Sequence, residues 1–407
     1  MTTTSTLPRA VITGLGITAP NGFGIDRYWA ATRRGESGIG RITRFDPSGY
    51  PVRLAGEVPP FDPNDYLPGR LVPQTDQMTR LALMAMDWAV EDAAVDLSTI
   101  PEELVGIVTG NSVGGLEFSQ RELEKLWSVG GKHVSAYLSF AWFYAANTGQ
   151  ISIRHGLRGP GGVLTGYAGG LDAVGHARRY VRDGVPLVVS GAVDSVLCPL
   201  GWVIEMTTGR VSEHPDPTRA YLPFDAAASG YLPGEGGAIL IVEDADAARR
   251  RDARPYGEIA GYGSTFDPAP GSDREPGLRR AIELALREAR VTPAEIDVVF
   301  ADAAGVAELD RAEATAISGV FGPHGVPVTA PKTMTGRLHS GSPALDVATA
   351  LLSMRHGVIP PTINVTDPVA ADQLDLVLDT PREASPRAAL VLARGDGLNS
   401  AIVLTAL

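Results

Sequence analysis

Hydrophobic and polar positions along the chain follow two periods, one typical of buried strands and one typical of helices. Short continuous apolar runs predict strands over the ranges 10–13, 105–109, 186–190 and 296–300. Apolar residues three, four and seven positions apart predict one buried helical face over 81–88 and another over 278–285. Strands and helices therefore alternate in both halves of the sequence, which favours a layered α/β/α architecture.

Two motifs beside predicted strands bear on local structure. Gly14-Leu15-Gly16 follows the first strand as in a dinucleotide-binding turn, but the third glycine of that fingerprint is missing. A plain tight turn is the better interpretation. Thr292-Pro293-Ala294-Glu295 combines a Thr cap, an early Pro and a Glu at the third position, which predicts the start of a helix.

The two halves of the sequence contain similar segments. The segments 182–186 and 355–360 resemble each other, and each ends a predicted helix, which indicates a duplicated βα unit. The run 243–254, rich in Ala, Asp and Arg, is the expected boundary. We therefore expect an N-terminal half over 1–245 and a C-terminal half over 246–407.

Composition narrows the class of protein. The 407 residues are 44% hydrophobic and 20% charged, which allows a large buried core. A net charge of −12 without a Lys/Arg tract argues against nucleic-acid binding. No apolar run approaches the length of a membrane span, and the polar, uncharged start does not resemble a secretory signal. The single cysteine excludes a disulfide framework and a cysteine metal site, so we expect a cytoplasmic protein without a metal.

The candidate chemistry lies in the run 163–173, where a β-prone segment ends in a glycine-rich turn before a helix-compatible stretch. Such a turn places one side chain at the positive end of a helix, where a thiol becomes a reactive thiolate. The side chain here is Tyr167, and a phenol with an ordinary pKa of about 10 is a poor acyl acceptor. The only cysteine, Cys198, lies about thirty residues further on. Thiol chemistry at this turn is therefore excluded.

Eight segments have sequences typical of one family, among them Pro223-Phe224-Asp225-Ala226-Ala227-Ala228 and Pro233-Gly234-Glu235-Gly236-Gly237. The others are 11–16, 44–46, 121–123, 125–128, 150–156 and 357–364. In this order they resemble the β-ketoacyl synthases of the thiolase superfamily, and more closely the chain-length factor, the β subunit of aromatic (type II) polyketide ketosynthases. The resemblance implies a thiolase-like fold, with duplicated βαβαβ halves in an α/β/α/β/α layered sandwich.

The resemblance also allows the catalytic positions of the family to be compared. An active ketosynthase carries Cys in Thr-Ala-Cys-Ser-Ser-Gly, and the matching position is Tyr167. Its two histidines are replaced by Asp302 and Arg337, whereas its lysine is retained as Lys332. An anionic Asp302 would oppose the charge that develops on the enolate. The resemblance therefore implies a site without catalytic residues.

Tyr167 also departs from the usual chain-length factor. That subunit commonly has Gln in Thr-Glu-Gln-Ala-Gly-Gly-Leu-Asp-Ala, so a role that depends on this carboxamide does not transfer. A phenol that fills space and hydrogen-bonds through its hydroxyl is the simpler interpretation, and a functional phenol is the alternative.

The resemblance implies an acyl tunnel at a heterodimer interface. Positions 116, 119 and 123 fall on one helical face, and the resemblance places the tunnel gates there as Leu116, Ser119 and Leu123. Family members that make shorter chains tend to carry Phe, Thr and Phe. Because Leu is smaller than Phe, we expect a longer cavity and a product of at least about ten ketide units. Ordinary core packing is the alternative interpretation of these leucines.

The implied partners are a cysteine-bearing ketosynthase α subunit and an acyl carrier protein, with no cofactor. Aromatic residues are frequent over 136–144, and we expect a partner interface there, with core burial as the alternative. The interface residues would be Tyr137, Phe140, Trp142 and Phe143.

The leading hypothesis is a non-catalytic subunit that completes the tunnel and sets polyketide length during decarboxylative condensation of malonyl units. One alternative is an independently active condensing or acyltransferase enzyme with an unusual site around Tyr167. Another is a structural homodimer that scaffolds other proteins. The seven histidines lack metal-like spacing, which argues against a metal enzyme.

Overall fold

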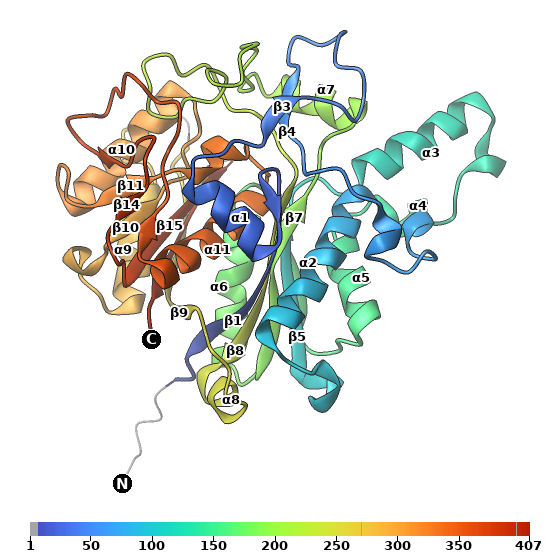
Figure 1. Ribbon diagram of the computed structural model, residues 1–407, viewed down its shortest axis with the longest axis horizontal. Coiled ribbons are helices and arrows are strands. Elements are labelled where there is room, and N and C mark those ends of the chain that lie inside the picture. The colour runs from blue at the N-terminus through green and yellow to red at the C-terminus, as the bar shows by residue number, and fades with distance from the viewer. Residues whose placement is uncertain (1–6, 270, 396) are drawn as a thin grey trace.

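A mixed sheet of twelve strands forms the centre of the computed structural model, which describes residues 7–269, 271–395 and 397–407 (Figure 1). Its strands are β1 Ala10–Ala19, β2 Gly22–Phe23, β5 Val105–Asn111, β6 Gly161–Thr165, β7 Leu187–Asp194, β8 Gly236–Asp244, β9 Gly257–Phe266, β10 Val298–Phe300, β11 Pro327–Thr329, β13 Asp375–Leu376, β15 Ala388–Gly395 and β16 Leu398–Thr405. They run in the order β13-β11-β10-β15-β16-β9-β1-β8-β7-β5-β6, and β2 pairs with β1. Two small antiparallel pairs lie outside this sheet, β3 Ile39–Arg41 with β4 Leu54–Gly56 and β12 Val358–Ile359 with β14 Arg382–Glu383.

Helices form three layers around the two halves of the sheet. The helices are α1 Gly24–Arg33, α2 Gln77–Ala93, α3 Leu116–Ser128, α4 Leu138–Ala141, α5 Ala146–His155, α6 Gly169–Arg182, α7 Pro199–Thr207, α8 Ala245–Arg250, α9 Leu278–Ala289, α10 Ala307–Phe321 and α11 Gly341–His356. Helices α6 and α11 share one apolar core with strands of both halves, so they form the middle layer. Helices α2 and α5 cover the outer face of the N-terminal strands, and α9 and α10 cover that of the C-terminal strands. The predicted α/β/α/β/α sandwich is confirmed.

The predicted elements lie within regular structure. The four predicted strands overlap β1, β5, β7 and β10, of which β7 starts one residue and β10 two residues later than predicted. The two predicted helical faces are buried in α2 and α9, except that Trp88 is half-buried. The two similar segments end α6 and α11, which are the paired helices of the middle layer. The expected boundary between residues 245 and 246 falls at the start of α8.

The tight turn predicted at Gly14–Gly16 is wrong, because β1 continues through it to Ala19. A Cβ atom on Gly14 or Gly16 would overlap the carbonyl oxygen of Ala89 or Ala85 on α2. Glycine is therefore required here for close helix–strand packing, and no reversal of the chain occurs.

The helix predicted to start at Thr292 is also wrong. The capping box forms, with Thr292 and Glu295 bonded reciprocally, but it closes a single 3₁₀ turn over Pro293–Glu295. The chain then enters β10 at Val298, so the strand pairing with β11 and β15 prevents the turn from continuing.

The N-terminal half contains an edge strand and a projecting helix. Strand β6 is the last strand of the sheet and pairs with β5 on one side. Helix α3 projects from the body, and the chain returns from its end to α4 (Figure 1). None of the helices in the described part of the chain is long and apolar enough to cross a membrane.

Candidate functional site

Tyr167 lies in the turn between β6 and α6, directly after Gly166, whose φ of +94° favours glycine. Its hydroxyl oxygen is 3.2 Å from that of Tyr231, and the Tyr231 hydroxyl donates to Glu205 Oε2 at 3.0 Å. The Tyr167 ring stacks on the ring of His339 with centroids 5.1 Å apart. The tyrosine thus fills space and hydrogen-bonds through its hydroxyl.

The same contacts make Tyr167 a poor nucleophile. Burial and the nearby Glu205 carboxylate raise the pKa of the Tyr167 phenol above its usual value. Because the Tyr231 hydroxyl donates its one hydrogen bond to Glu205, the Tyr167 hydroxyl must be the donor in the bond between the two tyrosines. The phenol stays protonated, and its proton points into the protein.

Asp302 and Arg337 form a buried bidentate ion pair. Arg337 Nη1 is 3.0 Å from Asp302 Oδ2, and Nη2 is 3.1 Å from Oδ1. The backbone N–H of Arg394 also donates to Asp302 Oδ1, at 3.0 Å. Burial opposes ionisation of Asp302, but the cations of Arg337 and Lys332 outweigh it and hold the pKa of this carboxyl below its usual value. Asp302 is therefore a carboxylate whose oxygens are already satisfied by the protein.

Lys332 lies behind this pair. Its Nζ atom is 2.8 Å from Asp346 Oδ2, and it also donates to the carbonyl of Ala301. Each buried cation thus faces a buried carboxylate, and Lys332 supports the strand end that carries Asp302.

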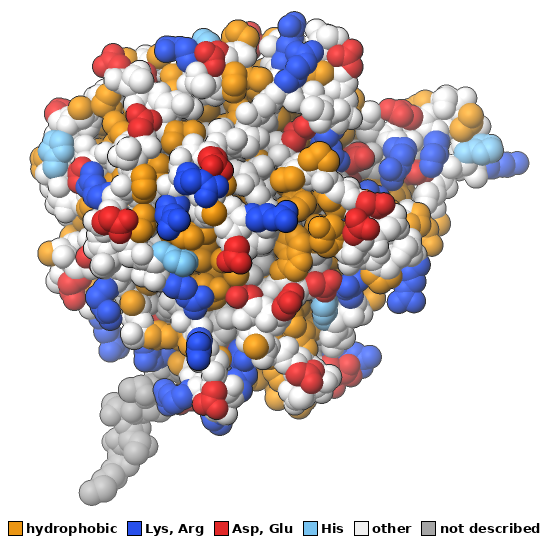
Figure 2. Space-filling view, viewed as in Figure 1, with side chains coloured by type: hydrophobic (Ala, Val, Ile, Leu, Met, Phe, Trp, Pro, Cys, Tyr) orange, Lys and Arg blue, Asp and Glu red, His pale blue; other side chains and the backbone are white. Residues whose placement is uncertain are grey.

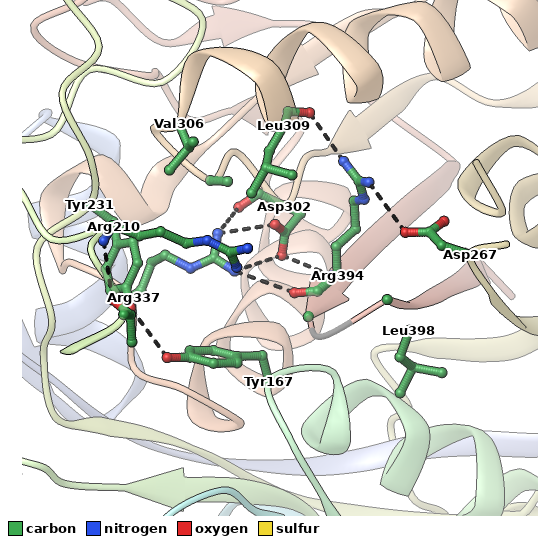
Figure 3. A pocket seen from close by; sticks show the side chains of 14 residues that line it. Tyr167, Arg210, Tyr231, Asp267, Asp302, Val306, Leu309, Arg337, Arg394 and Leu398 are labelled. Atoms are coloured by element: carbon green, nitrogen blue, oxygen red, sulfur yellow. Dashed lines mark hydrogen bonds and ion pairs between the residues drawn. The ribbon is translucent and has the colours of Figure 1, made fainter. Parts of the chain in front are cut away.

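The structure brings Tyr167, Asp302 and Arg337 together around one pocket of about 440 Å³ (Figure 3). Its described lining is Tyr167, Thr208, Arg210, Tyr231, Asp267, Asp302, Ala304, Val306, Leu309, Arg337, Arg394, Gly395, Gly397 and Leu398. None of these lining residues is a cysteine, serine or histidine. The pocket presents neither a thiolate nor a free imidazole.

The sequence interpretation missed Tyr231, Glu205, His339 and Arg394. These residues come from four separate segments, and the hydrogen bonds and stacking that unite them arise only when the chain folds. No local pattern in the sequence signals them. In the described residues, no group of His, Cys, Asp or Glu side chains is placed to hold a metal ion.

The three predicted gate residues lie on α3 with graded exposure. Leu116 packs on the apolar cluster around Trp202, and the Ser119 hydroxyl donates to the Gly115 carbonyl at 2.7 Å. Leu123 is exposed and lines an open hollow together with Trp127 and Leu200. The helical face that carries these three residues is thus packed on the protein at Leu116 and exposed at Leu123.

The aromatic residues over 137–143 are exposed, so core burial is excluded for them. They contact one another as the pairs Tyr137–Phe140 and Trp142–Phe143, with ring centroids 5.8 and 5.5 Å apart. The projecting part of the molecule carries such hydrophobic side chains among charged ones (Figure 2). We use the name apolar arm for the exposed apolar side chains on α3 and over 137–143, namely Leu123, Leu126, Trp127, Tyr137, Phe140, Trp142 and Phe143.

The layered fold, with its pocket at the start of α6, defines a thiolase-like ketosynthase class, as solved structures show. The ishigamide ketosynthase/chain length factor superposes with a TM-score of 0.92 at 30% identity, over 99% of this chain and 100% of that chain. A type II polyketide synthase acyl-carrier protein in complex with its ketosynthase bound to the hexaketide gives 0.90 at 25% identity, over 99% and 100%.

Sequence comparison leads to the family. Residues 8–248 match the beta-ketoacyl synthase N-terminal domain, and residues 256–366 match the C-terminal domain. The actinorhodin polyketide beta-ketoacyl synthase 2 of Streptomyces coelicolor is 59% identical over 97% of this chain and 98% of its own length. The tetracenomycin polyketide synthase ketoacyl synthase beta subunit of Streptomyces glaucescens is 58% identical over 97% of each. The chain belongs to the beta-ketoacyl synthase family, and the resemblance to its chain-length factors is confirmed.

Proposed function

We propose that this chain is the non-catalytic β subunit, or chain-length factor, of a type II polyketide ketosynthase heterodimer. The observation that carries the proposal is the pocket in which a protonated phenol and a closed Asp302–Arg337 pair occupy the positions of the catalytic residues. Decarboxylative condensation needs a nucleophile and donors directed at the developing enolate charge. Here the donors of Arg337 are committed to Asp302, so condensation is assigned to a partner subunit.

The proposed partners are a ketosynthase α subunit and an acyl carrier protein. The apolar arm and the last strand of the sheet, β6, both offer surface that a second chain can cover. Relatives at 58% and 59% identity are named as a beta subunit and as a second synthase, which supports a paired assembly. A cytoplasmic location and the division into halves 1–245 and 246–407 stay predictions.

Within the heterodimer, Leu116, Ser119 and Leu123 would line the acyl tunnel and limit the length of the chain. We expect the variant Leu116→Phe/Leu123→Phe to shorten the product, because two larger rings would fill the far end of the cavity. The measurement is mass spectrometry of the products made by the heterodimer with malonyl-loaded carrier protein.

The matched control is Leu104→Phe, the same substitution at an exposed leucine outside α3. Its products should equal those of the unchanged protein. Products of unchanged length from the double variant would exclude the gate assignment. Turnover of acyl substrates by the purified chain alone would instead favour the independently active enzyme.

A further inference from the structure

Helix α3, which carries the proposed gates, starts without a cap of its own. The residue before its first turn is Gly115, which has no side chain to accept a backbone N–H. A Cβ atom at this position would overlap the carbonyl oxygen of Ala141 and would lie 3.0 Å from the Cβ of Asp76. Position 115 therefore excludes the Ser, Thr, Asp or Asn that usually caps a helix.

Asp76 supplies the missing cap from another helix. Its Oδ2 atom accepts the backbone N–H of Phe118 in the first turn of α3 at 2.8 Å, and its Oδ1 atom accepts that of Met78 in α2 at 3.0 Å. Asp76 is 2% exposed, so both bonds are protected from water. One carboxylate thus joins the N-termini of α2 and α3.

This link connects the gate helix to the central sheet. Helix α2 packs on β1 so closely that Gly14 and Gly16 are needed at the contact, which fixes the position of Asp76. Phe118, whose N–H group donates to Asp76, is fully buried, and in the sequence it lies between the gate residues Leu116 and Ser119. The position of Asp76 therefore sets the position of the gate residues.

Ionisation suits this role. Burial raises the pKa of Asp76 to about 6, and the two backbone donors oppose the rise, so the group is mainly a carboxylate at neutral pH. A carboxylate accepts both N–H groups, whereas a side chain with one acceptor can serve a single helix.

We infer that Asp76 is a positioning residue for product length, a role that rests on the proposed gate function of α3. The test variant is Asp76→Asn, because asparagine keeps an acceptor for α2 and presents an NH₂ group to the Phe118 N–H. In the heterodimer, we expect the ratio of the main product to the other chain lengths to fall several-fold, because loss of a bond to a buried carboxylate loosens the first turn of α3. Deuterium exchange of the peptide over 116–123 should accelerate as well.

The matched control is Asp244→Asn, since Asp244 caps α8 by accepting the N–H groups of Asp246 and Ala247. It should leave both readouts unchanged. Asp76→Ser is the second variant if Asp76→Asn does not assemble, because serine also caps α2 and lacks the second oxygen.

Unchanged exchange over 116–123 overturns the inference. So does an unchanged product ratio when Leu116→Phe/Leu123→Phe does shift the products, and in that case the gate function stands. If neither variant shifts the products while exchange accelerates, the gate function is wrong and the role in product length falls with it.

Discussion

Tyr167 is explained by its surroundings rather than by a reaction. The Tyr167 hydroxyl donates a hydrogen bond to Tyr231, and the Tyr231 hydroxyl donates one to Glu205. The Tyr167 ring stacks on the ring of His339. Arg337 lies over the same ring, 5.8 Å from its centroid. A tyrosine at position 167 makes the hydrogen bond, the ring stacking and the cation–π contact at once. These contacts account for tyrosine at a position where the chain-length factors usually have Gln.

Cys198 should be unreactive in the folded protein. Burial raises the pKa of its thiol to about 11, and its Sγ atom accepts the N–H of Gly201 at the start of α7. At about pH 8 we expect iodoacetamide to alkylate it about two orders of magnitude more slowly than an unperturbed thiol, with a rate that rises towards pH 11. Mass spectrometry of timed samples measures this rate. The chain in concentrated urea is the control, and equal rates in both states would contradict the expectation.

Among the elements, the contact between β1 and α2 leaves no room for a single added methyl group. We expect Gly16→Ala to destabilise the protein by about 1–3 kcal/mol, because the new Cβ overlaps the Ala85 carbonyl and α2 must move away. Gly40→Ala in β3 is the control, since a Cβ atom there meets nothing within 4 Å. Urea unfolding of the two variants measures the difference, and equal free energies of unfolding would contradict this packing argument.

Apolar periodicity predicted the elements because burial acts on one strand or one helix at a time. The helical face of α9 and the strands β5 and β7 were predicted in this way. The glycines of β1 and the 3₁₀ turn at Pro293 were not, because each depends on a neighbouring element that local sequence does not reveal. In the candidate site, the replaced residues Tyr167, Asp302 and Arg337 were predicted from the resemblance. The hydrogen-bond chain from Tyr167 to Glu205 was not, because it joins distant segments.

At the scale of the whole molecule, the apolar arm predicts dependence on a partner. Trp127 near the end of α3 is 83% exposed, and the aromatic residues over 137–143, near the start of this helix, are exposed as well. We expect the chain produced alone to self-associate at micromolar concentration and to form a 1:1 complex when produced with its ketosynthase. Size-exclusion chromatography with light scattering distinguishes the two states.

Trp127→Lys should reduce self-association of the isolated chain, because it places a charge at the most exposed part of the arm. Ile153→Lys is the control, since Ile153 is an exposed apolar residue on α5, outside the arm. A stable monomer without a partner would contradict the expectation.

The Asp302–Arg337 pair also constrains the evolution of the protein. A histidine at either position alone would leave the other charge buried without its partner, at a cost of about 3–5 kcal/mol. That cost is a large part of the total stability of a typical domain, about 5–15 kcal/mol. A change to two histidines by single substitutions therefore passes through a destabilised intermediate. Folding stability by itself therefore favours keeping the pair, and with it a pocket that presents no free imidazole.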